Sequence, residues 1–495
     1  MRMGPLRVSW ALGAAAGMAA LLVAPATPVA MTASSTPVGP VTVQVGTTHP
    51  GPVVNEGLIG TNQPVTGAGE TAAAGAMSAL GVGWARTDMS LDAAYDCATG
   101  GWDPTALDQR VASDRAMGGQ PELIVDYSPP CMTTLGRTLE PPDAGNYGPW
   151  SGLVEEAAYH EITTQGVRLF EVWNEPDGTF WYGTLADYLS TYRATVLAID
   201  RAARAAGVDD VLVGGPALLF PDPAWLGPFL TYVTANQLPL GFVSWHYYGD
   251  YPGLGPFAEG AATVPPELPA VGPYWYNPMT RAQTYGYQVQ FVQQLLAGYP
   301  ALHPLTVIDE WNLDAGYDVR SDTAYDAAFA AAVLDSVQAA GLNRMAFFRV
   351  ADDQPGTLGN WGMLFANDTP KPVYSTFLFW HEMAGRLLPA SLSPDQTGAD
   401  PLGRVGAVAS LASDGTIRVL LYDYAPYDPT GAYGTTDPNP YDHPVTVTLG
   451  GLTPGVHSYS LAVVDGTGTK TTSGTTTGTV STGLSGESVA LLTVS

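Results

Sequence analysis

The sequence predicts an α/β protein, a (β/α)8 or TIM barrel followed by a C-terminal antiparallel β-sandwich. Eight short runs rich in Val, Ile and Leu alternate with long amphipathic stretches, as in repeated βα units around a parallel sheet. After Arg386 the sequence changes to short alternating runs separated by Gly, Thr, Ser and Asp, which is typical of antiparallel strands.

The barrel is expected over residues 57–386. Its predicted strands, in order, are Gly57–Asn62, Gly83–Asp88, Glu122–Tyr127, Leu169–Glu175, Val211–Pro216, Gly241–Tyr247, Thr306–Glu310 and Arg344–Val350. Helices are expected between them, for example at Leu185–Ala206 and Thr323–Ala340, where apolar residues recur every three or four positions and a glycine follows. The last barrel helix is predicted at Pro370–Arg386. This alternation fits a (β/α)8 barrel.

The sandwich is expected over residues 387–495. Its clearest strands are Thr416–Tyr422, Val445–Leu449, His457–Val464 and Ser488–Val494. In the segment 34–56, Val41–Val45 is expected to add an edge strand to this domain. The domain is expected to buttress the barrel, with carbohydrate binding as the alternative. The Asp-rich stretch Asp423–Asp442 is expected to be a solvated loop rather than a calcium site.

Residues 1–33 have the features of a secretory signal peptide. Arg2 and Arg7 precede an apolar stretch from Val8 to Val23, which is followed by small residues. The apolar stretch is shorter than a membrane span requires. We therefore expect a secreted protein with no membrane attachment after cleavage, and a retained N-terminal anchor is the alternative.

The charge balance narrows the class of partner. With 19 basic and 46 acidic residues, the formal net charge is −27. A chain this acidic is expected to repel nucleic acid and anionic membranes. Neutral or weakly charged carbohydrate is the compatible partner, and no cofactor is expected.

The chain has two cysteines, Cys97 and Cys131, after the second and third predicted strands. In an exported protein an even number of cysteines favours a disulfide, here one that braces neighbouring loops, and two free thiols are the alternative. Their spacing does not match a zinc site, and no metal is expected.

Two glutamates carry the predicted chemistry. Glu175 ends the run Phe-Glu-Val-Trp-Asn-Glu, and Glu310 ends the run Val-Ile-Asp-Glu. Each is expected at the C-terminal tip of a strand, where barrels of this type build their active sites. Two carboxylates facing each other across a pocket are the equipment for hydrolysing a glycosidic bond. Asn174, just before Glu175, is placed to hydrogen-bond a sugar 2-hydroxyl.

These motifs resemble glycoside hydrolase family 39, a group of retaining enzymes in clan A that includes β-xylosidases and α-L-iduronidases. The residues that carry the resemblance are 170–177 with Phe180-Trp181, Ser244–Tyr248, Ile308–Asn312 and Pro370–Tyr374. The resemblance spans about residues 57–386 and implies that Glu175 is the acid/base and Glu310 the nucleophile. A barrel followed by a β-sandwich is also the usual layout of this family.

Other polar residues are expected around the two glutamates. His246 is predicted to contact substrate or the nucleophile. Tyr248 is expected to hydrogen-bond Glu310, and the positive charge of Arg86 to hold Glu310 ionised. A structural ion pair is the alternative for Arg86. Arg349 is expected either to bind a substrate carboxylate or hydroxyl pair, or to form a salt bridge with Asp352 or Asp353.

Aromatic residues cluster after the predicted strand ends, where flat rings suit the C–H faces of sugars. Core packing is the alternative for about half of this group. Those assigned to substrate binding are Tyr127, Trp181, Trp311 and Trp361. The long connection from Gly249 to Pro278, with many prolines and a Tyr-Trp-Tyr cluster, is expected to form a wall or lid over the sugar site.

The function expected from these features is that of a retaining exo-glycosidase of β-xylosidase type, acting on oligosaccharides or polysaccharide side chains. One alternative is an enzyme of the same clan with another specificity, either an α-L-arabinofuranosidase type, a disaccharide-releasing enzyme or an endo-glycanase. The other is a non-catalytic carbohydrate-binding barrel, which would usually have lost one of the two glutamates.

Overall fold

The computed structural model describes residues 40–63, 70–249, 282–315, 318–353, 355–356, 358–394, 404–424 and 442–495. The expected signal peptide, nearly all of the expected lid and most of the Asp-rich stretch lie outside these residues. Among the helices described, none is both long enough and apolar enough to cross a membrane.

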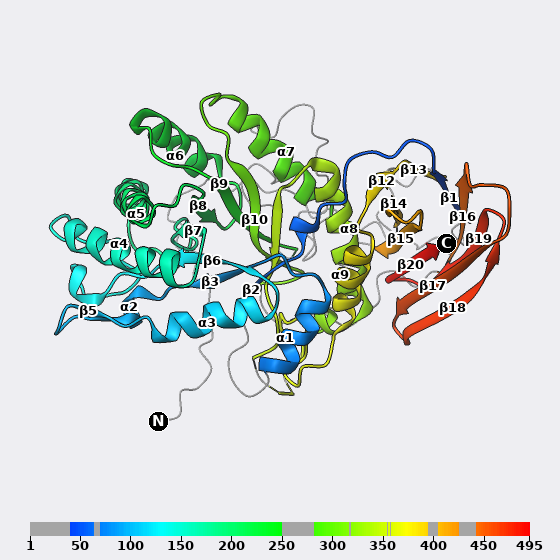
Figure 1. The fold of residues 1–495 in the computed structure, drawn as a ribbon, viewed down its shortest axis with the longest axis horizontal. Helices are drawn as coiled ribbons and strands as arrows, with labels where there is room; N and C mark the ends of the chain where they lie inside the picture. Colours follow the sequence, from blue (N-terminus) through cyan, green and yellow to red (C-terminus); the bar gives the residue numbers. More distant parts are fainter. Residues whose placement is uncertain are drawn as a thin grey trace, which may run out of the picture. The chain divides into compact units, whose positions relative to one another are not determined.

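The central element is a closed barrel of parallel strands, and it confirms the predicted fold class (Figure 1). Around the barrel the strands follow one another in chain order, so each strand pairs with its neighbour in sequence and the last closes on the first. They are β2 (Gly60–Asn62), β3 (Trp84–Asp88), β6 (Gln120–Val125), β7 (Leu169–Val172), β8 (Leu212–Leu218), β9 (Phe242–Tyr248), β10 (Leu305–Asn312) and β11 (Arg344–Phe347).

Helices surround the barrel (Figure 1). They are α1 (Glu70–Ala79), α3 (Thr105–Ala116), α4 (Tyr147–Thr164), α5 (Leu185–Ala206), α6 (Pro223–Asn236), α7 (Gln283–Ala297), α8 (Ala324–Ala340) and α9 (Pro372–Glu382). Helix α5 is capped at both ends, and its C-terminal glycine was expected. The Thr184 and Asp187 side chains form a capping box at the start of α5, and Gly207 ends it with a left-handed φ of 69°.

Shorter elements connect the barrel strands at both ends. They are the 3-10 turns η1 (Glu56–Leu58), η2 (Pro130–Met132) and η5 (Val319–Asp322), the short helix α2 (Leu91–Ala94) and the hairpin of β4 (Tyr95–Asp96) and β5 (Gly101–Trp102). A disulfide joins Cys97, just after β4, to Cys131 in η2. This bond ties together the loops that follow β3 and β6.

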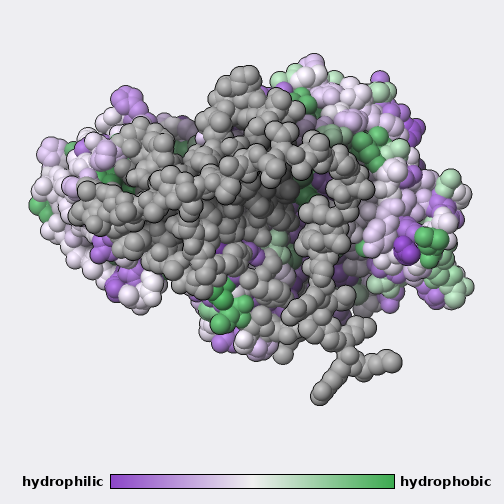
Figure 2. Space-filling model, turned by 180° about the vertical axis from the view of Figure 1, so that it is seen from behind, coloured by the Kyte–Doolittle hydropathy of each residue, from purple (hydrophilic) through white to green (hydrophobic). Residues whose placement is uncertain are grey.

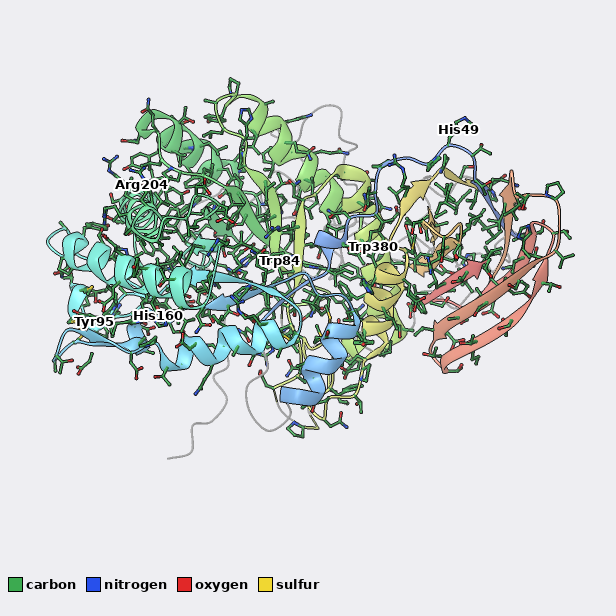
Figure 3. All side chains as sticks on the ribbon, in the orientation of Figure 1. His49, Trp84, Tyr95, His160, Arg204 and Trp380 are labelled. Atoms are coloured by element: carbon green, nitrogen blue, oxygen red, sulfur yellow. A yellow bond between two sulfur atoms is a disulfide. The ribbon has the colours of Figure 1, made fainter. Side chains whose placement is uncertain are left out.

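The inside of the barrel is layered from apolar to charged. Side chains alternate between the two faces of a strand, so every second residue points inward. The N-terminal layer of the interior is an apolar cluster of Trp84, Phe242, Val307 and Ala346, and Figure 3 shows Trp84 among the barrel strands. Two residues further along, the inward positions carry charge, as at Arg86 on β3. The barrel is therefore closed at its N-terminal end and polar toward its C-terminal end.

Several predicted strands are shorter than the sequence indicated; Arg344–Val350, for example, ends at Phe347. The first half of Gly57–Asn62 is the turn η1, because the Asn55 side chain accepts from the Gly57 N–H and starts that turn. The run Leu169–Glu175 leaves the sheet after Val172. Trp173 and Glu175 then adopt left-handed φ angles of 70° and 44°. Glu175 therefore lies in a tight turn after β7 rather than at the tip of the strand.

The C-terminal domain consists of two packed sheets, ordered β13-β1-β16-β19 and β12-β14-β15-β20-β17-β18. The strands are β1 (Val41–Gly46), β12 (Arg386–Leu388), β13 (Ala390–Ser393), β14 (Arg404–Leu411), β15 (Ile417–Tyr424), β16 (His443–Gly450), β17 (His457–Asp465), β18 (Gly468–Thr476), β19 (Thr479–Leu484) and β20 (Ser488–Val494). The N-terminal strand joins the domain, but not as the predicted edge strand. It lies inside its sheet, antiparallel to β13 and parallel to β16.

In the middle of the larger sheet, β15 and β20 are buried on both faces. In β15, Val419 and Leu421 pack in the sandwich core, whereas the alternate residues Leu420 and Tyr422 belong to the core of the barrel domain. The Tyr422 hydroxyl donates to Asp335 of α8 at 2.7 Å. Figure 1 shows α8 and α9 between the barrel strands and this sheet. The sandwich therefore shares a core with the barrel.

Polar residues cover much of the described surface. In Figure 2, which shows the reverse side, the coloured residues are mostly purple or white, with green patches scattered between them. The large apolar side chains instead gather in the two cores described above.

Candidate active site

A cavity of about 230 Å³ lies at the C-terminal ends of the barrel strands. This is the end where (β/α)8 barrels carry their sites. The described residues that line the cavity are Asn62, Gln63, Arg86, Asp88, Ile124, Tyr127, Asn174, Phe180, Glu310 and Phe348. The lining combines apolar rings with a few polar groups, which is the usual composition of a small-molecule site.

The two glutamates singled out in the sequence come together beside this cavity. One carboxylate oxygen of Glu175, one of Glu310 and a ring nitrogen of His246 all lie within 4.8 Å of one another. Glu175 follows β7 and Glu310 lies on β10, so the barrel closure brings together residues far apart in sequence. The pair has the spacing of two carboxylates that act on one bond.

Glu175 lies in a buried, strained turn. Its φ of 44° is unusual for a residue with a side chain, and its N–H is held by the carbonyl of Ala217 at 2.9 Å. The side chain is 6% exposed. Burial raises the pKa of Glu175 to about 7, and the charge of Arg86 opposes this rise. Glu175 can therefore hold a proton near neutral pH, as a general acid must.

Glu310 is surrounded by donors. The Arg86 guanidinium donates to Oε2 at 3.0 Å, and the Tyr248 hydroxyl donates to Oε1 at 2.6 Å. Both contacts were expected from the sequence. The pairing of β10 with β9 shifts between Ile308 and Glu310, which is the mark of a bulge. Because a bulge re-aims side chains, both Asp309 and Glu310 face the barrel interior.

Arg86 is the cation that organises the site. It is 2% exposed, and its guanidinium donates to Glu171 at 2.7 Å, to Asn174 at 2.8 Å and to Asn62 at 3.3 Å, as well as to Glu310. Burial alone would lower the pKa of Arg86, but the charges of Glu171, Asp309 and Glu310 raise it well above its usual value. Arg86 therefore stays charged and is more than an isolated ion pair.

His246 contacts both glutamates, but unequally. Its Nδ1 atom is 2.8 Å from Oε1 of Glu175 and 3.8 Å from Oε2 of Glu310. The hydrogen bond therefore falls on Glu175, the candidate acid, rather than on Glu310, the candidate nucleophile. Burial lowers the pKa of His246 to about 4, so the ring is neutral near pH 7. A neutral ring adds no charge beside Glu175.

Beneath the glutamates lies a layer of buried acids. Glu122, Glu171 and Asp309 each bring a carboxylate oxygen within 4.8 Å of the others, close enough to hold a metal ion. Burial raises the pKa of Glu122 to about 8, and burial with the charge of Glu171 raises the pKa of Asp309 well above its usual range. Burial opposes ionisation of Glu171 as well, but Arg86 outweighs it and lowers that pKa. Two protonated acids and one ion pair with Arg86 account for this layer.

Another group with possible metal ligands lies outside the barrel. Asp108 of α3 and the α4 residues His160 and Glu161 bring ligand atoms within 4.8 Å of one another. His160 already contacts Asp108 at 3.0 Å. None of these three residues is among the described residues that line the cavity.

Two of the aromatic residues assigned to substrate binding take the core-packing alternative. Trp311 is fully buried among Phe347 and other core rings, because it follows Glu310 directly and so points to the opposite face of β10. Trp181 is 5% exposed and packs edge-on against Trp173, with the two ring centroids 4.7 Å apart. Its neighbour Phe180, which is 40% exposed, lines the cavity instead.

The remaining predicted residues divide between the cavity and its surroundings. Tyr127 and Asn174 line the cavity. Trp361 lies one layer behind it, with its ring 5.8 Å from that of Phe348. Arg349 takes the salt-bridge alternative, pairing with Asp353 and donating to Gln63.

The sequence reading missed several polar residues of the site. Glu171, Asp309 and Asp88 were not assigned any role, although each is an acid within or at the end of an apolar strand. An acid at such a position costs free energy unless it is paired or protonated, and that was the available signal. Gln63 was also missed. It lies in the loop after β2, and only the placement of that loop shows that it lines the cavity.

Comparisons with known proteins agree with this fold. The model of the family "Glycosyl hydrolases family 39" matches residues 138–436, more than half of the chain. A β-xylosidase of Caldicellulosiruptor saccharolyticus is 26% identical over 327 residues, which cover 61% of this chain and 61% of the relative. The match thus spans less than two thirds of that relative's length.

Solved structures resemble the chain over nearly its whole length. A monomeric β-xylosidase from Caulobacter crescentus CB15 has a TM-score of 0.71 and 18% identity, covering 92% of this chain and 99% of that one. A glucosidase from Croceicoccus marinus has a TM-score of 0.68 and 18% identity, covering 93% and 99%. At this identity the likeness concerns the fold. The family match, supported by the fold and by the paired glutamates, shows that the chain belongs to glycosyl hydrolase family 39.

Proposed function

We propose that this protein is a retaining glycosidase in which Glu175 is the acid/base and Glu310 the nucleophile. The observation that carries the proposal is the short approach of the two carboxylates, within 4.8 Å. Retaining enzymes keep these groups about 5–5.5 Å apart, whereas inverting enzymes leave about 6.5–9.5 Å for a water molecule. Glu175 is buried beside His246, whereas Glu310 accepts from Arg86 and Tyr248. This difference assigns the acid/base role to Glu175 and the nucleophile role to Glu310.

In the first step, protonated Glu175 donates its proton to the glycosidic oxygen as Glu310 attacks the anomeric carbon. The bond from that carbon to the leaving oxygen breaks, and a glycosyl ester on Glu310 forms. In the second step, ionised Glu175 takes a proton from water, and the water oxygen attacks the anomeric carbon. The ester bond breaks, Glu310 leaves as a carboxylate, and Glu175 is protonated again.

The charge states in the site suit these steps. Arg86 and Tyr248 each donate a hydrogen bond to a different carboxylate oxygen of Glu310 and so hold the nucleophile in place. The buried turn keeps a proton on Glu175 until the leaving group accepts it. When two neighbouring carboxyl groups have different surroundings, one can act as an acid and the other as a nucleophile at the same pH.

The proposed substrate is a terminal sugar, removed by exo action as in β-xylosidases. The cavity of about 230 Å³ is smaller than the roughly 300–1,000 Å³ typical of pockets for drug-sized ligands, which favours a single sugar ring. The 26% identity to a β-xylosidase supports xylose as the sugar to test first. Other specificities within the clan remain outcomes of that test.

We also propose that the enzyme is secreted. The N-terminal Arg2 and Arg7 with the apolar stretch after them support export, as does the disulfide between Cys97 and Cys131. Expression of the full chain in a secreting bacterial host tests this. Secretion predicts a mature protein in the medium that begins after the apolar stretch, whereas full-length protein retained in the cells would contradict it.

The catalytic proposal is tested by following hydrolysis of aryl β-xyloside, α-arabinofuranoside, β-glucoside and β-galactoside with proton NMR. The first-formed sugar is expected to have the anomeric configuration of the substrate, and Glu310→Gln is expected to abolish turnover while keeping the wild-type melting temperature. An inverted first product, or wild-type activity in Glu310→Gln, would contradict the proposal.

A further inference from the structure

A second pair of acids meets at the cavity, apart from the two catalytic candidates. Asp88 ends β3, is half-buried and lines the cavity together with Glu310. Asp126 follows β6 and is fully buried. In the barrel Asp88 pairs in register with Ile124, two residues before Asp126. The two acids therefore stand on neighbouring strand ends.

The backbone fixes this pair in place. Three successive N–H groups after Asp88 bind the end of β6. Met89 donates to the Ile124 carbonyl at 2.9 Å, Ser90 to Oδ1 of Asp126 at 3.2 Å and Leu91 to the Asp126 carbonyl at 2.6 Å. Ser90 adopts a left-handed φ of 51° to make this turn. A conformation that costs free energy and is held by three hydrogen bonds positions Asp88 firmly at the cavity.

The two side-chain oxygens of Asp126 differ in their hydrogen bonding. Oδ1 of Asp126 accepts from Ser90, whereas Oδ2 is buried and has no hydrogen-bond donor among the described residues. Burial and the charge of Asp88 raise the pKa of Asp126 well above its usual range. A protonated Asp126 becomes a donor, and a hydrogen bond to Asp88 satisfies it. Asp126 thus supports Asp88 from behind, and the side chain that faces the cavity is that of Asp88.

From this geometry we infer that the Asp88–Asp126 pair selects the sugar, so that Asp88 accepts hydrogen bonds from hydroxyls of a neutral ring and excludes sugars that carry a carboxylate. The inference rests on the proposed glycosidase function and adds the class of sugar to it. A carboxylate accepts from two hydroxyls at once, which suits a pair of neighbouring hydroxyls. Asn174, which accepts a hydrogen bond from Arg86, remains the candidate for the 2-hydroxyl.

No cation in the described part of the cavity lining is available to pair with the carboxylate of an acidic sugar. Among the described residues that line the cavity, Arg86 is the one cation, and its donors already bind acids and amides. Arg349, behind the lining, pairs with Asp353. An acidic sugar would bring its carboxylate into a cavity that already carries Asp88 and Glu310, and like charges in a confined site repel.

The test compares turnover of neutral and acidic sugars. The neutral substrate is whichever of the aryl β-xyloside, α-arabinofuranoside, β-glucoside and β-galactoside the wild type cleaves fastest. The acidic substrates are aryl β-glucuronide and aryl α-L-iduronide. For the wild type, kcat/KM is expected to be at least about 100-fold lower on both acidic substrates than on the neutral one.

Asp88→Asn keeps the size of the side chain and removes its charge. Its kcat/KM on the neutral substrate is expected to fall about 10- to 100-fold, as for loss of hydrogen bonds to a charged group. The ratio of acidic to neutral turnover is expected to shift at least about tenfold toward the acidic substrates. Asp126→Asn keeps an N–H that can donate to Asp88, and is expected to lose less activity than Asp88→Asn.

The matched control is Asp96→Asn, an acid in the exposed hairpin of β4 and β5, whose kinetics should equal those of the wild type. Thermal melting checks that each variant folds. If Asp88→Asn melts far below the wild type, Asp88→Glu replaces it, because it keeps the charge and should retain the preference for the neutral sugar.

The outcomes separate this inference from the proposed function. Comparable wild-type turnover of an acidic substrate, or an Asp88→Asn variant within twofold of the wild type on the neutral one, overturns the selection by Asp88. If Glu310→Gln is inactive in those same assays, the proposed retaining chemistry stands. A wild type that cleaves no glycoside overturns both.

Discussion

A carboxylate oxygen of Glu175 lies within 4.8 Å of one of Glu310, yet the two side chains have different partners. Glu310 accepts from Arg86 and Tyr248, whereas Glu175 faces the neutral ring of His246. The same barrel end thus holds one acid where its charge is compensated and the other where its proton is retained. The predictions below follow from that asymmetry.

The activity should depend on a proton on Glu175. Because burial raises its pKa to about 7, kcat/KM is expected to fall about tenfold per pH unit above that value. The measurement is a pH profile with an aryl glycoside whose leaving group needs protonation. Glu175→Gln with a readily leaving aryl group should show no such fall. A wild-type profile that stays flat to pH 9 would contradict the assignment.

Glu175 should also lower stability at alkaline pH. An unfolded glutamate loses its proton near 4.5 and folded Glu175 near 7, so between these values the folded state binds more protons. Unfolding therefore becomes easier as pH rises through this window. Glu175→Gln is expected to be more stable than the wild type above pH 7, by up to about 3 kcal/mol. Urea unfolding at pH 4.5 and 8 measures this.

The control for that experiment is Glu155→Gln, at an exposed glutamate paired with Arg201 on the protein surface. Its stability should change by less than about 1 kcal/mol at either pH. An equal stability of Glu175→Gln and the wild type at pH 8 would show that Glu175 ionises as easily in the folded state as in the unfolded state.

Arg86 should be essential to both structure and activity. Arg86→Met removes the charge that compensates buried Glu171 and Glu310, so the free energy of unfolding is expected to fall by about 3–5 kcal/mol. Urea unfolding and kcat/KM are the measurements. Arg201→Met, which breaks an exposed pair, should cost less than about 1 kcal/mol. Equal effects of the two changes would refute the central place of Arg86.

The hydroxyl of Tyr248 should act through Glu310. Tyr248→Phe removes the 2.6 Å hydrogen bond to Glu310 and is expected to lower kcat about 10- to 100-fold with little change in melting temperature. Pre-steady-state kinetics shows whether formation of the intermediate is the slowed step. Tyr159→Phe, at a residue 45% exposed on α4, is the matched control and should match the wild type.

The stability of the contact between the barrel and the sandwich should depend on Tyr422. Tyr422→Phe leaves Asp335 of α8 buried without this donor, and burial already raises the pKa of Asp335 to about 6. The variant is expected to lose about 1–3 kcal/mol of stability near neutral pH. Thermal unfolding measures it, with Tyr182→Phe at an exposed site as control. An unchanged Tyr422→Phe would mean that the two domains do not rely on this contact.

The sequence predicted the barrel because each parallel strand is a continuous apolar run, and it predicted the two glutamates because each follows such a run. It placed Glu175 on the strand, since nothing in the run shows that the chain turns after Val172. That turn depends on contacts such as the one between the Glu175 N–H and the Ala217 carbonyl, which form only when β8 is in place.

The aromatic residues show that closeness in sequence to a catalytic candidate does not predict a place in the site. Trp311 adjoins Glu310, yet alternation along the strand sends it into the core. The strand period was enough to foresee this. Asp88 was missed for another reason. Its partner Asp126 follows a different strand, β6, and an acid pair is recognised only after the two strand ends are side by side.

The most direct test of the account is to trap the intermediate with an aryl 2-deoxy-2-fluoro glycoside of the preferred sugar. The fluorine slows both steps, and the activated aryl group lets the first proceed. Mass spectrometry of the intact protein should show one added glycosyl group, and peptide mapping should place it on Glu310. A label on any other residue, or complete turnover of substrate with no label, would contradict Glu310 as the nucleophile.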